Sequence, residues 1–291
     1  PLGVTLIGGE NPDSTITAAD FAERGYLCVR EGLFDAGISN LTEAVRLDPY
    51  DDISYYNLGK AYLKTGELTN AVEELTKAVS LDSRNSFALD ERGVAYARER
   101  QFAKAMADFS RALALKPDDG LAYYHRALVY YKQERFDEAL QDFNKAEEFA
   151  PEVPWILRNR ARIHCKLGHW RQAVADFAAA LRREPDDLYT CNNYAWLLAT
   201  CPDSQVRDGK KAVGLAIKAC KGTQWRTWYC IGTLAAAYAE TGAFDEALKY
   251  QEQALKTAGA SAKEMLQEQD TLSLYNRHKP YREVFHRTHT K

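Results

Sequence analysis

The chain has 291 residues, of which 46% are hydrophobic and 27% are charged, and its formal net charge at pH 7 is −3. This composition excludes a disordered chain, and the small negative charge excludes a general attraction of the molecule to nucleic acid or to an anionic membrane. The sequence contains no run of 18 apolar residues that could cross a bilayer, so a soluble chain is predicted.

Residues 1–17 are predicted to be an N-terminal leader. They hold a short apolar run, Val4–Ile7, followed by two glycines and a proline, and the run is expected to lie against the first helix. It lacks the basic start of a signal peptide. Because residue 1 is proline, two interpretations stay open: the chain is a processed product, or it is a piece of a longer protein. The predicted location is cytoplasmic, with an exported or periplasmic location as the alternative if a signal was removed.

From residue 18 onward, the chain follows a period of 34 residues. Within each period, apolar or small residues recur at steps of three and four, which indicates helices and not strands. Each period is therefore predicted to form a helical hairpin, and a stack of such hairpins buries a continuous core. The small residues that mark the period are Gly25, Gly59, Gly93, Ala127, Ala161 and Ala195.

This register predicts seven units and a C-terminal cap. The sixth unit is six residues longer than the period, and its helices are expected at Leu188–Thr200 and about Gly209–Cys220. A last helix, about Ala262–Tyr275, is expected to cover the apolar face of the seventh unit, and the basic tail from Arg277 is expected to fray. The predicted ranges are 18–51, 52–85, 86–119, 120–153, 154–187, 188–226 and 227–259 for the units, and 260–291 for the cap and tail.

Glycine marks the middle of several hairpins. Gly32, Gly66 and Gly168 fall where a left-handed residue ends the first helix. Arg100 and Glu134 stand at the same place in two other units, and they are expected to be less favourable there.

The repeated positions resemble those of the tetratricopeptide repeat (TPR) family. The pattern of small, Tyr, Ala, Phe, Ala and Pro residues at Gly93, Tyr96, Ala105, Phe109, Ala112 and Pro117 returns 34 residues later. The resemblance implies an all-α fold, an α-α superhelix (TPR solenoid) of about seven helix-turn-helix repeats, with the first helix of each pair lining a concave groove. Trp196-Leu-Leu-Ala-Thr-Cys-Pro in the extended unit resembles a terminal module of bacterial TPR proteins, which predicts a bacterial source.

A recurring pair of charged residues is interpreted as scaffold. Arginine precedes the small residue of the first helix, and aspartate precedes the phenylalanine of the second helix, in three consecutive units. We expect these side chains to form ion pairs that brace the hairpins. The residues are Arg92, Arg126 and Arg160 with Asp108, Asp142 and Asp176.

The candidate site lies on other residues. Trp155, Arg158, Arg162 and Lys166 follow steps of three, four and four, so they share one helix face that is too polar for a core. The resemblance places this face in the concave groove. The same reasoning adds candidate groove residues from the other units, which are Tyr56, Asn57, Lys60, Tyr124, His125, Asn159, Asn192 and Asn193.

The chemistry of these residues suits a peptide ligand. Asparagine both donates to and accepts from a peptide backbone, and arginine binds carboxylates. Between Arg158 and Arg183 there are seven basic residues and one acid, Asp176, which favours a partner segment that is acidic in part. A solvated face without a ligand is the alternative. The resemblance also raises chaperone-tail binding, but Tyr229 and Thr233 replace bases of that site, so it is not predicted.

No catalytic, cofactor or metal site is predicted. The six histidines lack metal-ligand spacing, and no phosphate-binding glycine loop or nucleophile motif occurs. The six cysteines are interpreted as free thiols, with a Cys201–Cys220 bridge as the exception to test. The predicted function is a non-catalytic scaffold that binds a protein partner and no nucleic acid. The alternatives are a regulatory arm of a larger enzyme, such as a bacterial kinase, and a self-associating structural scaffold.

Overall fold

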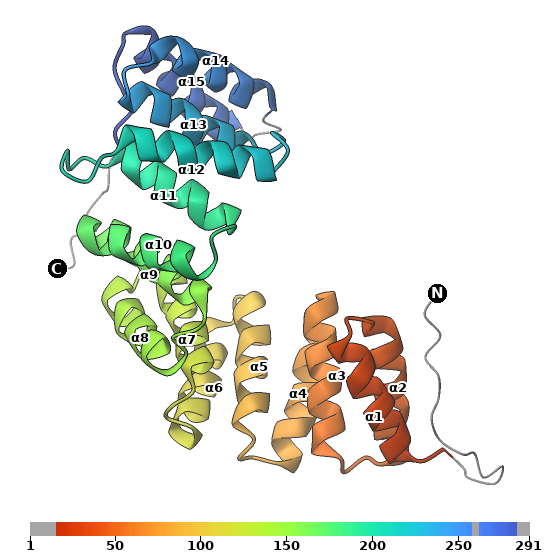
Figure 1. The fold of residues 1–291 in the computed structure, drawn as a ribbon. Coiled ribbons are helices and arrows are strands. Elements are labelled where there is room, and N and C mark those ends of the chain that lie inside the picture. Colours follow the sequence, from red (N-terminus) through yellow and green to blue (C-terminus); the bar gives the residue numbers. More distant parts are fainter. Residues whose placement is uncertain (1–15, 258–261, 284–291) are drawn as a thin grey trace. The chain divides into compact units, whose positions relative to one another are not determined.

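A computed structural model describes residues 16–257 and 262–283, with the backbone alone for 262–268 (Figure 1). Every regular element in these ranges is an α-helix, which confirms the predicted all-α class. The predicted leader lies outside the described residues except for its last two. The chain divides into two compact units, the first ending at Val129 and the second beginning at Tyr130.

The first unit consists of helical hairpins stacked in chain order. α1 packs on α2, α3 on α4 and α5 on α6, and the stack continues where α2 packs on α3 and α4 on α5. The boundary between the two units, after Val129, lies within α7. The helices are α1 (Ala18–Arg30), α2 (Phe34–Leu47), α3 (Asp52–Thr65), α4 (Leu68–Leu81), α5 (Ser86–Arg98), α6 (Phe102–Leu115) and α7 (Gly120–Lys132).

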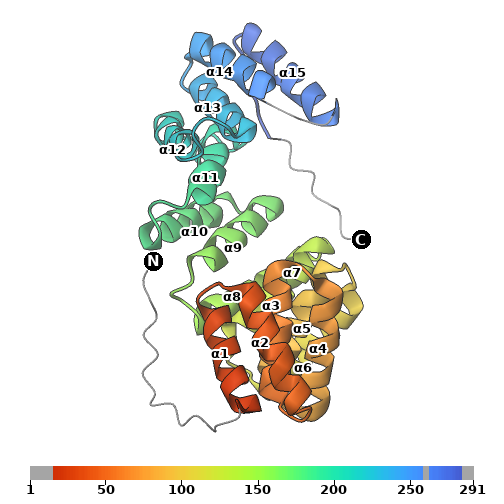
Figure 2. The same cartoon turned by 90° about the vertical axis from the view of Figure 1, so that its right-hand side faces the viewer.

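The second unit continues the same organisation. α9 packs on α10, and α11 packs on α12. α13 packs on α14 and also on both helices of the preceding hairpin, α11 and α12. α15 packs on α14 (Figure 2). The two helices expected in the longer sixth repeat are present, and the second extends to Gly222. The helices are α8 (Phe136–Phe149), α9 (Pro154–Leu167), α10 (Trp170–Arg183), α11 (Leu188–Thr200), α12 (Gly209–Gly222), α13 (Trp228–Glu240), α14 (Phe244–Thr257) and α15 (Ala262–Asn276).

The small residues of the period lie where two helices of a hairpin meet. A Cβ atom added to Gly59 would lie 2.5 Å from Cγ of Leu75, and one added to Gly93 would lie 2.6 Å from the ring of Phe109. Both partners are buried. Because a close-packed core has no room for these atoms, a larger residue would push the helices apart.

The turns inside the hairpins adopt the expected left-handed backbone. Gly66 and Gly168 have φ angles of 87° and 75°, and Arg100 and Glu134 at the same repeat position have φ angles of 62° and 60°. A residue with a side chain in this conformation costs about 1–2 kcal/mol relative to the right-handed one. Two hairpins therefore hold a turn that glycine would adopt more readily.

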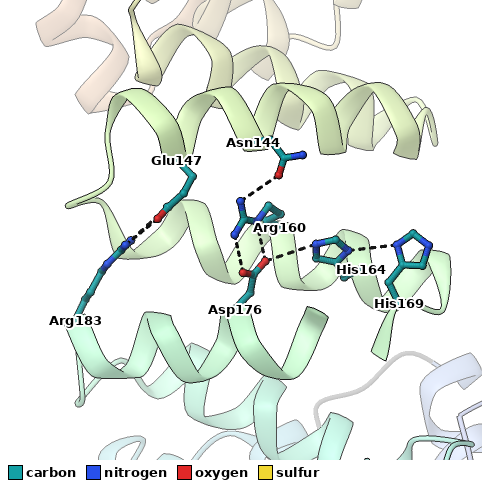
Figure 3. A network of polar contacts seen from close by, with 7 residues as sticks. All are labelled: Asn144, Glu147, Arg160, His164, His169, Asp176 and Arg183. Carbon is teal, nitrogen blue, oxygen red and sulfur yellow. Dashed lines mark hydrogen bonds and ion pairs between the residues drawn. The ribbon is translucent and has the colours of Figure 1, made fainter. Parts of the chain in front are cut away.

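The predicted brace is present in the second unit. Arg160 of α9 donates from Nε and Nη2 to the two carboxylate oxygens of Asp176 in α10, both at 2.7 Å, and from Nη1 to Oδ1 of Asn144 in α8 at 3.1 Å (Figure 3). One guanidinium thus joins three helices. His164 lies beside the pair, with Nε2 3.8 Å from Oδ2 of Asp176, and burial lowers its pKa. A neutral, packed histidine is consistent with its place at the tyrosine position of the repeat.

The first unit repeats this brace. Arg92 of α5 donates to the two carboxylate oxygens of Asp108 at 2.7 and 2.8 Å, and its Nη1 donates to Oγ1 of Thr76 in α4 at 3.3 Å. The bidentate geometry fixes the approach of the helices. Two of the three predicted pairs are confirmed, and the pairing of Arg126 with Asp142 stays a prediction.

The C-terminal end covers the last hairpin. Tyr275 of α15 is 0% exposed and lies in one cluster with Ala235, Ala239 and Ala247 of α13 and α14. The prediction that the tail from Arg277 frays is wrong for residues 277–283, because the backbone N–H of Glu283 donates to the carbonyl oxygen of Thr200 at 3.0 Å. Residues 284–291 lie outside the described part.

Candidate functional site

The helix α9 presents the predicted polar face. It starts with Pro154 in its first turn, which suits a helix N-terminus, and ends at Gly168 in the left-handed conformation. Its other side is buried through Ile156, Leu157 and Ile163. That burial fixes the rotation of the helix, so the polar face is directed away from the core.

Arg158 is committed to an internal ion pair. Its Nη1 donates to Oδ2 of Asp187 at 2.6 Å, and its guanidinium lies 5.1 Å from the ring centroid of Tyr189. Asp187 is also the N-cap of α11, where it accepts the backbone N–H of Tyr189 at 3.1 Å. Burial acts to raise the pKa of Asp187, but the bonds from Thr190 and Arg158 outweigh it, and the net pKa is lowered. Arg158 therefore joins α9 to α11.

Arg162 and Lys166 carry the remaining charge of the face. Arg162 donates to Oδ1 of Asn159 and to the hydroxyl of Tyr131, both at 3.2 Å, and its guanidinium lies 5.1 Å from the Tyr131 ring centroid. Lys166 is exposed. Among the residues that the structure describes, neither cation has a carboxylate within ion-pair distance. Burial raises the pKa of the nearby Glu283, and the charge of Lys166 opposes this rise only in part.

This pairing reduces the basic surplus that the sequence suggests. Arg160 binds Asp176, and Arg183 binds Glu147 at 2.7 Å, as Figure 3 also shows. Arg158 is neutralised by Asp187. The partner acids Glu147 and Asp187 lie outside the basic stretch 158–183. The positive charge available to a ligand on α9 is therefore that of Arg162 and Lys166.

Three repeat positions in succession combine an exposed aromatic ring with a polar residue four places later. Trp155, Tyr189 and Tyr229 are 39%, 42% and 46% exposed. Asn159 and Asn193 donate Nδ2 to the carbonyl oxygens of Trp155 and Tyr189 at 2.8 and 2.9 Å, and Thr233 donates to that of Tyr229 at 2.9 Å. We call Trp155, Tyr189 and Tyr229 the aromatic ladder. Sequence reasoning selected Trp155 alone, although the 34-residue spacing links it to Tyr189, and Tyr229 follows 40 residues later, after the longer sixth unit.

Beside the ladder, the second unit contains a pocket that sequence reasoning also missed. Its volume is about 410 Å³. Of the predicted residues it includes Asn192 and Asn193. Asn192 is 8% exposed, and its Oδ1 has no hydrogen-bond partner in the described structure. The lining residues are Tyr189, Asn192, Asn193, Trp196, Trp228, Tyr229, Gly232, Thr233, Gln251, Thr271 and Tyr275.

Tyr56, Asn57, Lys60, Tyr124 and His125 are the predicted residues that lie in the first unit. Lys60 lies 5.8 Å above the ring of Tyr56, and Asn57 is buried. Burial, followed by the charges of Glu91 and Asp90, raises the pKa of Tyr56 to about 12.

His125 is held in place by an acid of the preceding repeat. Its Nδ1 lies 2.9 Å from Oδ2 of Asp90, and its ring packs edge to face against Tyr124. Burial alone lowers the pKa of His125, but Asp90, with Glu91 and Asp119, outweighs burial and raises it. His125 is therefore engaged by residues of its own unit.

The six cysteines add no reactive group to the site. All six cysteines are free, so Cys201 and Cys220 are not bridged. Burial raises the pKa of Cys165 and Cys220 to about 12 and that of Cys230 to about 11, so these three are unreactive as nucleophiles near neutral pH. The part of the chain that is described holds no cluster of potential metal ligands and no helix with the length and apolar character needed to span a bilayer.

Stacked helical hairpins with a polar and aromatic face on their first helices define a helical repeat protein. Sequence models described as tetratricopeptide repeat or TPR repeat match residues 53–85, 93–134, 120–153, 158–201 and 229–260. The chain belongs to the tetratricopeptide repeat family. The curated proteins include no sequence match to it.

Solved structures show the same fold. A tetratricopeptide repeat protein from Parabacteroides merdae is 19% identical over 89% of this chain and 98% of its own, with a TM-score of 0.57. MamA from Desulfovibrio magneticus RS-1 is 21% identical over 58% of this chain and 96% of its own, with a TM-score of 0.52. A chain of the APC/C hetero-tetramer Cut9-Hcn1 is 13% identical over 91% of this chain and 50% of its own, with a TM-score of 0.68. The fold and the repeats support a protein-interaction scaffold.

Proposed function

We propose that the second unit binds an extended segment of a partner protein on the surface formed by α9 and α11, with acidic residues of that segment against Arg162 and Lys166. The observation that carries this proposal is that Arg162 and Lys166 have no carboxylate within ion-pair distance in the described structure, while the Arg162 guanidinium lies 6.0 Å from the ring centroid of Tyr189 in the aromatic ladder. Exposed aromatic rings and arginine are the residue types that protein interfaces favour.

The internal contacts support a rigid, preformed surface. Arg158 is fixed by Asp187, and Arg162 is bonded to Asn159 and Tyr131. Side chains that are already ordered lose less conformational entropy when a ligand binds. The surface can therefore bind an extended segment without a large rearrangement of its own.

The experiment is affinity capture from the source cells with matched charge reversals. The site variant is Arg162→Glu with Lys166→Glu. The control is Arg182→Glu with Lys210→Glu, two exposed residues on α10 and α12 that form no ion pair in the described structure. Both variants change the net charge equally, so a general electrostatic effect acts on both.

The proposal expects that the site variant loses a partner that the wild type and the control variant both retain. Equal capture by all three proteins overturns it. Equal loss by both variants also overturns it, because the effect is then one of total charge and not of position.

A further inference from the structure

The pocket beside the aromatic ladder has a lining that carries no charged side chain. Among its residues are five aromatic rings, three amides and two threonines. Such a lining disfavours a carboxylate or an ammonium group, because a charge that leaves water for it gains no opposite charge in return. The lining therefore favours an uncharged group.

Asn192 supplies the polar specificity of the pocket. Asn192 as a residue is 8% exposed, its Oδ1 atom is buried, and that atom lacks a hydrogen-bond donor in the described structure. A buried acceptor that stays unpaired is unfavourable, so a ligand that brings a donor recovers this free energy. The N–H of a peptide backbone is such a donor, and it accompanies every side chain of an extended segment.

A tail segment of the same unit packs against Trp196 on this surface. The ring centroid of Tyr281 lies 5.6 Å from that of Trp196, and the indole Nε1 of Trp196 donates to Oε2 of Glu283 at 2.9 Å. Trp196 also lines the pocket. An aromatic residue followed two places later by an acid is thus seated beside Trp196, next to the pocket.

We propose that the pocket anchors one aromatic side chain of the partner segment, that Oδ1 of Asn192 accepts a backbone N–H of that segment, and that an acidic residue close to the anchor faces Arg162 or Lys166. This inference rests on the proposed function, and it adds the anchor to the recognised sequence. The volume of about 410 Å³ falls within the range of roughly 300–1,000 Å³ that ligand pockets have.

A pocket-filling variant is available within the repeat itself. The residues at the position of Asn192 in two earlier repeats are Tyr56 and Tyr124, so Asn192→Tyr places there a side chain that the array already accommodates. It is expected to occupy the pocket. Asn192→Leu is the second variant, because it keeps the approximate size and removes the acceptor. Tyr50→Ala is the control, since Tyr50 is 82% exposed in the first unit. Circular dichroism checks the folding of each variant.

The test is selection of a phage-displayed library of random linear peptides on the full chain and on its variants. We expect wild type and Tyr50→Ala to enrich peptides with an aromatic residue near an acid. A synthetic peptide of this kind should bind at least about tenfold more weakly to Asn192→Tyr and several-fold more weakly to Asn192→Leu. Replacement of its aromatic residue by alanine should weaken binding to wild type to a similar extent, and this arm needs no protein variant.

The outcomes separate the two proposals. The anchor proposal is overturned if the peptides bind the Asn192→Tyr variant with the same affinity as wild type, or if they need no aromatic residue. If these peptides still lose affinity for Arg162→Glu with Lys166→Glu, the proposed function stands without it. A selection that enriches no peptide overturns both.

Discussion

Arg158 and Asp187 form an ion pair across α9 and α11, with 2.6 Å between Nη1 and Oδ2. Their side chains are 25% and 14% exposed. The arginine that the sequence places first in the ligand site is therefore part of the scaffold that holds the site in shape. A test of ligand binding has to leave this residue in place and change Arg162 and Lys166 instead.

Reversal of Arg158 should destabilise the second unit. Arg158→Glu places two carboxylates together at the N-terminus of α11, and we expect the free energy of unfolding to fall by about 2 kcal/mol, between the values for exposed and for fully buried pairs. Urea denaturation followed by circular dichroism measures the change. Arg182→Glu is the exposed control and should change stability by less than about 0.5 kcal/mol. Equal stability of Arg158→Glu and wild type would show that the ion pair is absent.

The Arg160–Asp176 brace should show strong coupling. We expect Arg160→Met to cost about 2 kcal/mol, because it leaves the 10% exposed carboxylate of Asp176 without its bidentate partner. Asp176→Leu in the same chain should restore part of that loss. A double-mutant cycle measures the coupling, expected at about 1–2 kcal/mol. Additive effects of the two single changes would rule out the brace as a stabilising contact.

Glycine should improve the two left-handed turns that lack it. Arg100→Gly and Glu134→Gly each relieve a φ angle near 60°, and each is expected to stabilise by about 0.5–1 kcal/mol after the added entropy of the unfolded chain is subtracted. The matched control is Gly66→Ala, which should destabilise by about 1 kcal/mol. Thermal denaturation of the three variants checks the signs, and a lower melting temperature for both glycine variants contradicts the prediction.

His125 should make stability depend on pH near neutrality. Its pKa in the folded chain is raised above the ordinary value of 6.5, so the folded state binds the proton more tightly than the unfolded state does. The stabilisation is complete below the unfolded pKa and is lost as pH rises through the folded pKa. Urea denaturation from about pH 6 to about pH 9 should show this loss in wild type and not in His125→Gln. Identical pH profiles would show that Asp90 does not hold the protonated ring.

The hairpins and their braces could be predicted because both are local repeats. Helical periodicity and small residues at one spacing recur along the chain, and Arg160 and Asp176 are 16 residues apart within one hairpin. Contacts within one hairpin recur at the repeat spacing, so a single sequence is enough to predict them. The left-handed turns at Arg100 and Glu134 follow from the same register.

The contacts of the candidate site could not be predicted from the repeat pattern, because they join different hairpins. Asp187 resembles a simple helix cap in the sequence, and its bond to Arg158 depends on how α11 packs against α9. Glu283 is 87 residues from Trp196, and nothing in the basic tail indicates that it folds back. The aromatic ladder is the exception, since Tyr189 follows Trp155 by one period.

In the proposed function, Arg162 and Lys166 recognise an acidic part of a partner segment. The most direct measurement is the dissociation constant of the captured segment, by isothermal titration calorimetry, for wild type, Arg162→Glu with Lys166→Glu, and the control Arg182→Glu with Lys210→Glu. We predict that the site variant raises the dissociation constant at least about tenfold, a loss of roughly 1.4 kcal/mol, and that the control changes it by less than about twofold. An equal change of the dissociation constant in both variants, or no change in the site variant, would contradict recognition by Arg162 and Lys166.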